Sequence, residues 1–221
     1  MPQRVLITGG FGSLGAAVAR AFEAAGASVA LIDLTPAPEG AGPTRIGGVD
    51  LTDPAAAERA FAAAKAALGG ADVVVNVAGG FVWERTDGDP QAWRRMFDMN
   101  VTSCLNMCRA AVAGLSDGGV IVNVSAAASE RAAAGMGPYA ASKAAVARLS
   151  EALAAELGGR IRVNAVQPLA MDTPANRRDM PSVDPKSWTT PAAVADAIVF
   201  LASPQSRAIN GALVPVTNPG V

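Results

Sequence analysis

The sequence predicts an α/β fold, a doubly wound parallel sheet with helices on both faces, in a single domain over residues 1–221. Short apolar runs alternate with longer alanine-rich stretches along the whole chain. Most of these runs are nearly continuous in Val, Ile and Leu, which is typical of strands buried on both faces. No linker, repeat or low-complexity tract interrupts the alternation, and 221 residues suffice for one large core. Such strand–helix alternation predicts a parallel sheet between two helical layers.

The expected elements follow from these runs and from the residues that bound them. Seven strands are expected, at Arg4–Thr8, Ser28–Asp33, Thr44–Val49, Asp72–Val77, Gly119–Val124, Ile161–Val166 and Leu213–Val216. Five helices are expected, at Leu14–Ala25, Pro54–Leu68, Gln91–Leu115, Tyr139–Leu157 and Pro191–Leu201. Two helices begin with proline after a capping residue, Asp53 or Thr190. Residues 168–190 are irregular and follow the end of a strand, where such sheets bind ligands, so a substrate lid is expected there.

Composition excludes several classes of partner. The net charge is −1 and only 17% of residues are charged, so no basic patch for a nucleic acid is expected. The longest apolar runs are about six to eight residues, too short to cross a membrane. The N-terminus runs directly into a predicted strand, so no signal peptide is expected, and two cysteines favour a reducing cytoplasm. Without histidine, no metal site is expected.

A glycine-rich loop, TGGFGSLG, joins the first strand to the first helix. Glycine allows a sharp turn and a close approach to a pyrophosphate, and the helix N-terminus presents free N–H groups to phosphates. The loop therefore predicts nucleotide binding through Gly9, Phe11, Gly12, Ser13, Leu14 and Gly15.

Two acids at the ends of strands favour a dinucleotide. Asp33 stands 18 residues after Gly15, near the spacing at which a carboxylate binds the ribose hydroxyls of an adenosine. It would repel a 2′-phosphate, and Leu34–Pro36 offer no cation to bind one, so NAD is favoured over NADP. Asp50, with Leu51 beside it, either binds the adenine amino group or shapes the entry to the next helix.

The acid–base candidates are Tyr139, the only tyrosine, and Lys143, four residues later in the segment GMGPYAASK. Alone, such a pair is common by chance and is usually structural. A phenol with a pKa of about 10 is a poor base at neutral pH. An ammonium one helical turn away, on the same face, favours the phenolate and lowers this pKa. Because the chain has no histidine, this pair is the natural candidate for proton transfer.

Several motifs occur in a specific order along the chain: TGGFGSLG, the acid of ALIDL, VDLTD, NVAG, FDMN, IVNVS, YAASK, and IRVNAVQP followed by Thr173. On these motifs the sequence resembles the short-chain dehydrogenase/reductase family, of the short single-domain type, over essentially its full length. The resemblance implies a seven-stranded Rossmann-type sheet. It also implies an NAD(P)-dependent oxidoreductase that transfers hydride between nicotinamide and a small carbonyl, alcohol or C=N compound.

The same resemblance implies roles for individual residues. Tyr139 would be the general acid/base, Lys143 would lower its pKa and bind the nicotinamide ribose, and Asn100 would position a water in a proton relay. Further cofactor contacts would come from Asn76, Ala78, Gly79, Pro168 and Thr173. Family members usually pair through the helices at Gln91–Leu115 and Tyr139–Leu157, which implies a homodimer or homotetramer.

Three departures from the family pattern affect the interpretation. The glycines are spaced GxxGxxG, which is similar to dihydropteridine reductases. The usual catalytic serine is Ala126, and Ser125 one residue earlier would serve only if the strand bulges, because a slip of one reverses the side chain. Leu169 replaces a glycine after Pro168. These departures leave open a dihydropteridine-reductase-like reduction of a quinonoid heterocycle, or a non-catalytic NAD-binding regulatory protein.

Substrate-pocket candidates are apolar or aromatic, which suggests an apolar or flat small-molecule substrate. They are Trp83, Met136 and Met171, with Phe81, Val82, Met180 and Trp188 as further candidates. Each of these side chains can equally serve packing or lid structure. Four arginines can bind an anionic group or lie solvated on the surface: Arg85, Arg131, Arg177 and Arg178.

Overall fold

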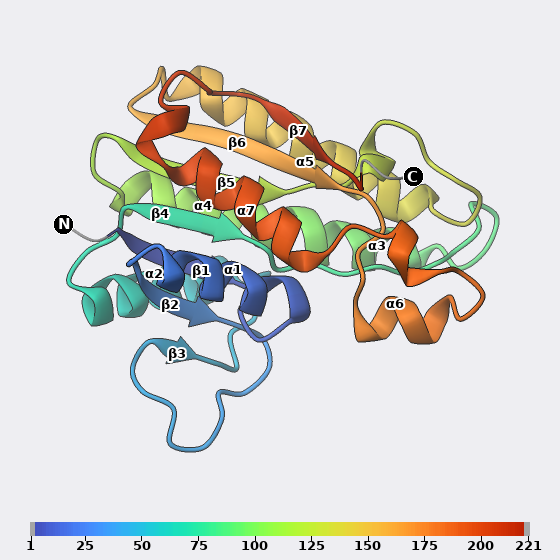
Figure 1. The fold of residues 1–221 in the computed structure, drawn as a ribbon, viewed down its shortest axis with the longest axis horizontal. Helices are drawn as coiled ribbons and strands as arrows, with labels where there is room; N and C mark the ends of the chain where they lie inside the picture. The colour runs from blue at the N-terminus through green and yellow to red at the C-terminus, as the bar shows by residue number, and fades with distance from the viewer. Residues whose placement is uncertain (1–2, 219–221) are drawn as a thin grey trace.

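In the computed structural model, which describes residues 3–218, the chain folds into one seven-stranded sheet whose neighbouring strands all run parallel (Figure 1). The order across the sheet is β3-β2-β1-β4-β5-β6-β7. The strands are β1 (Arg4–Thr8), β2 (Ser28–Ile32), β3 (Arg45–Ile46), β4 (Val73–Asn76), β5 (Gly119–Val124), β6 (Ile161–Pro168) and β7 (Leu213–Val216). The predicted sheet is confirmed. Residues 1–2 and 219–221 of the predicted domain lie outside the described residues.

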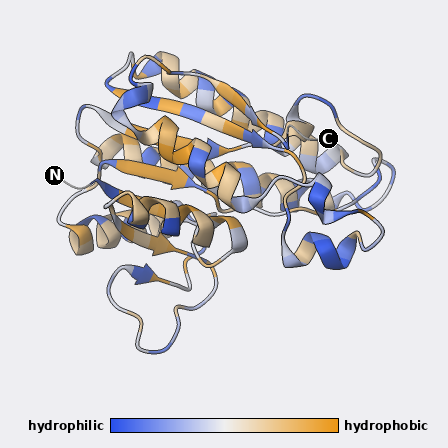
Figure 2. Cartoon of the chain, viewed as in Figure 1, coloured by the Kyte–Doolittle hydropathy of each residue, from blue (hydrophilic) through white to orange (hydrophobic). Residues whose placement is uncertain are grey.

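Two helical layers cover the two faces of the sheet. Helices α1 (Ser13–Ala24) and α7 (Pro191–Ala202) pack against each other on one face. Helices α2 (Pro54–Leu68), α4 (Ser103–Gly114) and α5 (Gly137–Glu156) cover the other face. Each layer encloses its own apolar cluster against the sheet, in which β2 and β4 are strongly hydrophobic along their length (Figure 2). Two further helices are short, α3 (Gln91–Phe97) and α6 (Pro174–Asp179).

Side-chain hydrogen bonds confirm the two helix starts that were predicted after Asp53 and Thr190. The Asp53 carboxylate accepts a hydrogen bond from the Ala55 N–H, and Pro54 occupies the first turn of α2. Thr190 caps α7 in the same way through the Ala193 N–H. These bonds satisfy donors that have no partner inside the helix. No helix among residues 3–218 combines the length and the apolar character that a membrane span requires.

The prediction of one continuous helix at Gln91–Leu115 was wrong in its middle. Residues Asp98–Thr102 form a π-helical turn between α3 and α4. The turn inserts an extra residue into the helical ladder, a feature common at functional sites. The segment 168–190 is also more regular than predicted, because it contains α6 and a 3₁₀ turn at Pro185–Ser187. The predicted third strand shrinks to Arg45–Ile46.

A buried polar ladder joins the middle of the sheet to α5. The Asn76 amide on β4 donates to Asn123 Oδ1 on β5, at 2.9 Å. The Asn123 amide in turn donates to the Ser150 hydroxyl on α5, at 2.8 Å. All three side chains are almost fully buried. Because unpaired buried amides are costly, this ladder fixes how α5 sits on the strands.

Candidate functional site

A cleft of about 1470 Å³ lies at the carboxyl ends of the strands. The strand order reverses between β1 and β4, and ligands bind outside such a switch point in doubly wound sheets. Nearly all of the predicted site residues line this cleft. They are Gly9, Phe11, Gly12, Ser13, Leu14, Gly15, Asp33, Asp50, Leu51, Ala78, Gly79, Trp83, Ser125, Met136, Tyr139, Lys143, Pro168, Met171 and Thr173.

The glycine loop has the shape that a pyrophosphate requires. Gly9 has a φ of +62°, and a Cβ at Gly15 would lie 2.1 Å from the Gly9 carbonyl oxygen. Gly12 is the N-cap of α1, and no side chain in the described part of the protein caps this helix. The first N–H groups of α1 are therefore available to an anion in the cleft. The loop fits the diphosphate of a dinucleotide.

The Asp33 carboxylate stands beside this loop. Its Oδ2 accepts from the Phe11 N–H at 2.9 Å, and its Oδ1 accepts from the Thr35 N–H at 2.8 Å. Each carboxylate oxygen has a further lone pair, so Asp33 can still accept two hydroxyls. The two backbone bonds hold the carboxylate at the cleft in a fixed orientation.

Asp50 accepts from both the backbone N–H and the hydroxyl of Thr52, at 2.9 and 2.7 Å. The hydroxyl bond, followed by the backbone bond, lowers the pKa of this carboxyl below its usual value. Asp50 therefore shapes the entry to α2, the second of the two interpretations that the sequence left open, while it also lines the cleft.

Tyr139 lies in the first turn of α5, and its ring meets the Phe81 ring edge-on at 5.0 Å. The Lys143 Nζ lies 6.0 Å from the centre of the Tyr139 ring and donates to the Val124 carbonyl at 2.9 Å. Burial lowers the pKa of Lys143 to about 8. Burial also raises the pKa of Tyr139 to about 12. In this geometry desolvation of the phenolate dominates the pKa of Tyr139, and the lowering expected from Lys143 stays a prediction.

Asn100 occupies the centre of the π-helical turn. Its side chain accepts from the Gly80 N–H at 2.9 Å and donates to the Gly80 carbonyl at 3.1 Å. It also donates to the Ser142 hydroxyl on α5, at 2.9 Å. A Cβ at Gly79 would lie 2.4 Å from Asn100 Oδ1 and 3.3 Å from Lys143 Nζ. The absence of a side chain at Gly79 thus leaves room for both the Asn100 amide and the Lys143 ammonium beside the backbone.

Comparisons with known proteins agree with this geometry. A family model described as enoyl-(acyl carrier protein) reductase matches residues 10–218. A 2,5-dichloro-2,5-cyclohexadiene-1,4-diol dehydrogenase from Sphingobium indicum is 34% identical over 96% of this chain and 93% of its own. An NAD-dependent oxidoreductase from Mycobacterium tuberculosis is 36% identical over 76% of this chain and 69% of its own. A short-chain dehydrogenase from Burkholderia cenocepacia, solved with NADP, is 31% identical over 97% of this chain and 96% of its own, with a TM-score of 0.85.

The chain belongs to the short-chain dehydrogenase/reductase family. It is an NAD(P)-dependent oxidoreductase of that type, as the enzymes it matches are.

The serine hydroxyls near the expected position of the family's catalytic serine all donate hydrogen bonds to other groups of the protein. Ser125 is buried, and its hydroxyl donates to the Lys143 carbonyl at 2.8 Å. Ser129 donates to the Ala126 carbonyl and accepts from Gln167. Strand β5 ends at Val124, and Ala126 beyond it has the extended angles φ −161° and ψ 157°. The Ser125 hydroxyl thus points to the backbone of α5, which fits a supporting role, and its use in place of the family's serine stays a prediction.

The prediction for Asn76 also needs correction. Its amide is part of the buried ladder with Asn123, and it donates to the Cys108 thiol at 3.3 Å. Asn76 is not among the residues that line the cleft. It supports the sheet beneath the short-chain dehydrogenase/reductase site, whereas Ala78 and Gly79 of the same motif line the cleft.

The substrate end of the cleft is apolar. Trp83, Met136 and Met171 line it as predicted, together with Phe81 and Met180. Trp188 is buried and lies outside the lining, and Val82 is not part of it. Two further apolar side chains were missed, Met99 and Leu169. Met99 directly precedes Asn100, and Leu169 directly follows Pro168, so proximity to these two predicted residues was the available signal.

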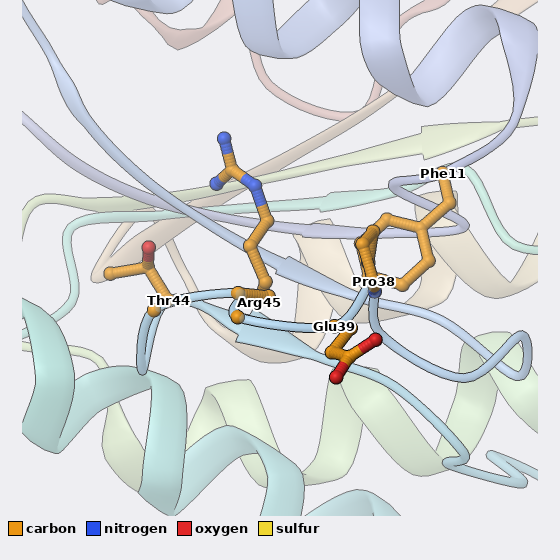
Figure 3. A pocket seen from close by; sticks show the side chains of 8 residues that line it. Phe11, Pro38, Glu39, Thr44 and Arg45 are labelled. Carbon is orange, nitrogen blue, oxygen red and sulfur yellow. The ribbon is translucent and has the colours of Figure 1, made fainter.

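A second, smaller pocket of about 460 Å³ lies beside the nucleotide end, between Phe11 and the loop at residues 38–45. In Figure 3 the Arg45 side chain extends away from the Glu39 carboxylate. Arg45 is instead 3.7 Å from Glu23 on α1. Among the described residues, Phe11 is the only predicted site residue in this pocket, so the chemistry belongs to the larger cleft.

Proposed function

We propose that this short-chain dehydrogenase/reductase transfers hydride between NAD, in preference to NADP, and a small carbonyl, alcohol or C=N compound, with Tyr139 as general acid/base. The observation that carries the proposal is the shared cleft. The uncapped N-terminus of α1, Asp33 and the Tyr139–Lys143 pair all line one cavity. Tyr139 is the only tyrosine of the chain, and it lines the cleft together with the buried Lys143.

The NAD preference is supported by Asp33. Its carboxylate is held by two backbone N–H groups and lines the cleft beside the glycine loop. A fixed negative charge there accepts ribose hydroxyls and repels a 2′-phosphate. The residues of the loop and the first turn of α1 would hold the diphosphate, and Thr173 and Pro168 would hold the nicotinamide end. The nicotinamide supplies or accepts the hydride when bound.

The proton moves at the Tyr139 oxygen. In the reductive direction its hydroxyl donates a proton to the substrate atom that gains electrons, and a pKa of about 12 keeps the phenol protonated before it reacts. Lys143, whose pKa is about 8, carries a positive charge at neutral pH and stabilises the phenolate left behind. Asn100 holds the π-helical turn next to Lys143, where we place a relay to solvent.

The kind of bond reduced is constrained by the missing hydroxyl. Ser125 and Ser129 both donate elsewhere, so the Tyr139 hydroxyl is the donor that this segment leaves for a substrate oxygen. A C=N or quinonoid substrate has less need of a second donor than a ketone, whose oxyanion develops full charge. This observation favours, as a second candidate, reduction of a quinonoid heterocycle as in dihydropteridine reductases.

Residues 168–190 are proposed as the substrate lid. The first half of this segment, through α6, supplies part of the cleft wall, including Leu169, Met171 and Met180. Figure 2 shows α6 as one of the most hydrophilic elements, which suits a helix with solvent on its outer side. A lid of this composition would close an apolar surface over the substrate.

The assembly and the compartment are proposed from surface and thiol chemistry. Phe97 at the end of α3 and Leu105 on α4 expose more than a third of their surface, which supports a homodimer or homotetramer through these two helices. Cys104 and Cys108 are free and buried, and their sulfurs lie 4.0 Å apart. Two adjacent unoxidised thiols support a reducing cytoplasm.

One experiment tests the proposal directly. Purified protein is titrated with NADH and NADPH, then assayed with ketones, quinones, imines and quinonoid pterin, alongside Tyr139→Phe. We expect tighter binding of NADH, and turnover that falls by about 10²-fold or more in Tyr139→Phe, since a general acid contributes on that order. Cofactor binding should survive the substitution. Turnover that persists in Tyr139→Phe would remove the tyrosine from the mechanism, and binding without any turnover would support a regulatory role.

A further inference from the structure

Of the four arginines considered as anion-binding candidates, only Arg131 lies in the cleft without a partner among the described residues. The other three form ion pairs: Arg85 with Asp87, Arg177 with Asp172, and Arg178 with Asp179. Arg131 has no hydrogen bond or ion pair with any of the residues 3–218. It is also the only one of the four that lines the cleft.

The segment that carries Arg131 is anchored on both sides. On one side, the Gln167 amide donates to the Ser129 hydroxyl at 2.7 Å and to Glu130 Oε1 at 2.9 Å. On the other side, the Glu84 N–H donates to the Gly135 carbonyl at 2.8 Å. These bonds hold the segment against the cleft. Glu130, the acid next to Arg131 in the sequence, is therefore hydrogen-bonded to Gln167 and not paired with Arg131.

The wall around Arg131 is apolar. The lining residues on the same segment are Ala127, Ala128, Ala133, Ala134 and Met136. In the described part of the chain, three acids line the cleft as a whole, Asp33, Asp50 and Asp179. The first two lie beyond β2 and β3, beside the nucleotide loop, and Asp179 is paired with Arg178. The substrate end therefore combines an apolar surface with one uncompensated guanidinium.

We propose that Arg131 binds an oxyanion carried by the substrate, and that the enzyme selects substrates with an apolar body and an acidic group such as a carboxylate. The proposal rests on the proposed function, since it places the acid in the cleft that holds Tyr139. A guanidinium binds a carboxylate through two parallel hydrogen bonds, which orient as well as attract. Such an anchor would fix the distance between the acidic group and the bond presented to Tyr139.

The test uses matched pairs of a keto acid and its methyl ester, for example 4-acetylbenzoate with methyl 4-acetylbenzoate, on an aryl, a cyclohexyl and a linear scaffold. The variant is Arg131→Gln, and the matched control is Arg85→Gln, an exposed arginine outside the cleft. We expect Arg131→Gln to lower the acid-to-ester ratio of kcat/KM by about five- to tenfold, because one charge-assisted contact is lost. Added salt should reduce the wild-type ratio. Arg85→Gln should leave it as it is.

Binding is measured separately from turnover, through quenching of tryptophan fluorescence by each keto acid and ester in the presence of oxidised NAD, which cannot reduce them. Turnover with an acid-to-ester ratio that Arg131→Gln does not change would overturn the role of Arg131 and leave the proposed function intact. Acid binding that Arg131→Gln weakens, without turnover of any pair, would support the anion site and overturn the proposed function. Failure of every acid to bind better than its ester would also overturn the anion site.

Discussion

The hydroxyl of Ser125 donates a hydrogen bond to the backbone carbonyl of Lys143, with 2.8 Å between the two oxygens. This bond ties the end of β5 to α5, the helix that carries both Tyr139 and Lys143. Because side chains alternate along an extended chain, Ala126 then turns to the other side. Ser125 therefore supports the helix, and position 126, where the family resemblance places the catalytic serine, carries only a methyl group.

Restoring the hydroxyl at position 126 should increase ketone reduction. We expect Ala126→Ser to raise kcat/KM for a ketone by about tenfold, since a donor to a developing oxyanion is worth at least that much. The same change should have little effect on an imine or quinonoid substrate. Ala128→Ser, on the same segment, is the matched control. Equal ketone rates in Ala126→Ser and the wild type would show that position 126 does not face the reacting bond.

Removing the charge of Asp33 should relax the choice of nucleotide. Asp33→Asn retains an acceptor for hydroxyls but no longer repels a 2′-phosphate, so the ratio of NADPH to NADH affinity should rise by about tenfold. Dissociation constants for both nucleotides, from equilibrium titration, measure this ratio. A wild-type protein that binds the two equally well would refute the role given to Asp33.

Lys143 should make the stability of the protein depend on pH. Burial lowers its pKa from an ordinary value of 10.5 to about 8, so the unfolded state binds more protons than the folded state between these values. The destabilisation from burying the charge is fully present below pH 8 and declines as the pH rises toward 10.5. Relative to the wild type, Lys143→Met should therefore gain about 2 kcal/mol of stability on going from pH 10 to pH 7.

Urea unfolding of both proteins at several pH values measures this difference. The lost bond to the Val124 carbonyl also lowers the stability of the variant, so the test uses the change in the stability difference between pH values and not its absolute size. A stability difference that stays constant from pH 7 to pH 10 would mean that the ammonium is not buried.

The position of the Trp83 ring should require a glycine at position 135. A Cβ at Gly135 would lie 2.0 Å from Trp83 Cε2, and the residue has a φ of +75°. Gly158→Ala is the matched control, because Gly158 has a φ of +56° and a methyl group added there would meet no described atom within 4 Å. Both alanines bear about 1 kcal/mol of backbone strain, but only Gly135→Ala should also displace the indole ring.

Tryptophan emission and the KM for an apolar substrate measure this displacement. Gly135→Ala should shift the emission and raise KM, and the shift should vanish in a Trp83→Phe background. Identical behaviour of the two alanine variants would show that Trp83 adapts without consequence for the cleft.

The sheet, its helical layers and the nucleotide loop were predictable because each depends on local signals. Apolar runs mark buried strands, glycines mark the turn into α1, and Asp53–Pro54 marks the start of α2. The π-helical turn was not predictable. It is held by Asn100 binding the backbone of Gly80, 20 residues earlier, and no periodicity in Gln91–Leu115 signals such a contact.

The differences between expectation and structure within the site have the same origin. Asn76 ends a strand that is buried on both faces, so alternation did not show which way its amide turns. The Ser125 hydroxyl and the pKa of Tyr139 both depend on α5 lying close to β5, a tertiary contact between distant segments. Sequence reasoning identified which residues meet in the cleft, and packing decided which of their polar atoms remain available.

The ladder of Asn76, Asn123 and Ser150 has a consequence for how the sequence can diverge. Replacing any one of them with an apolar residue would leave a buried polar group on a neighbour without this hydrogen-bond partner, at a cost of about 1–3 kcal/mol. Replacing all three with apolar residues of matching volume would remove that cost. Substitutions at these three positions should therefore occur together. A relative that lacks one of the three polar side chains should lack the other two as well.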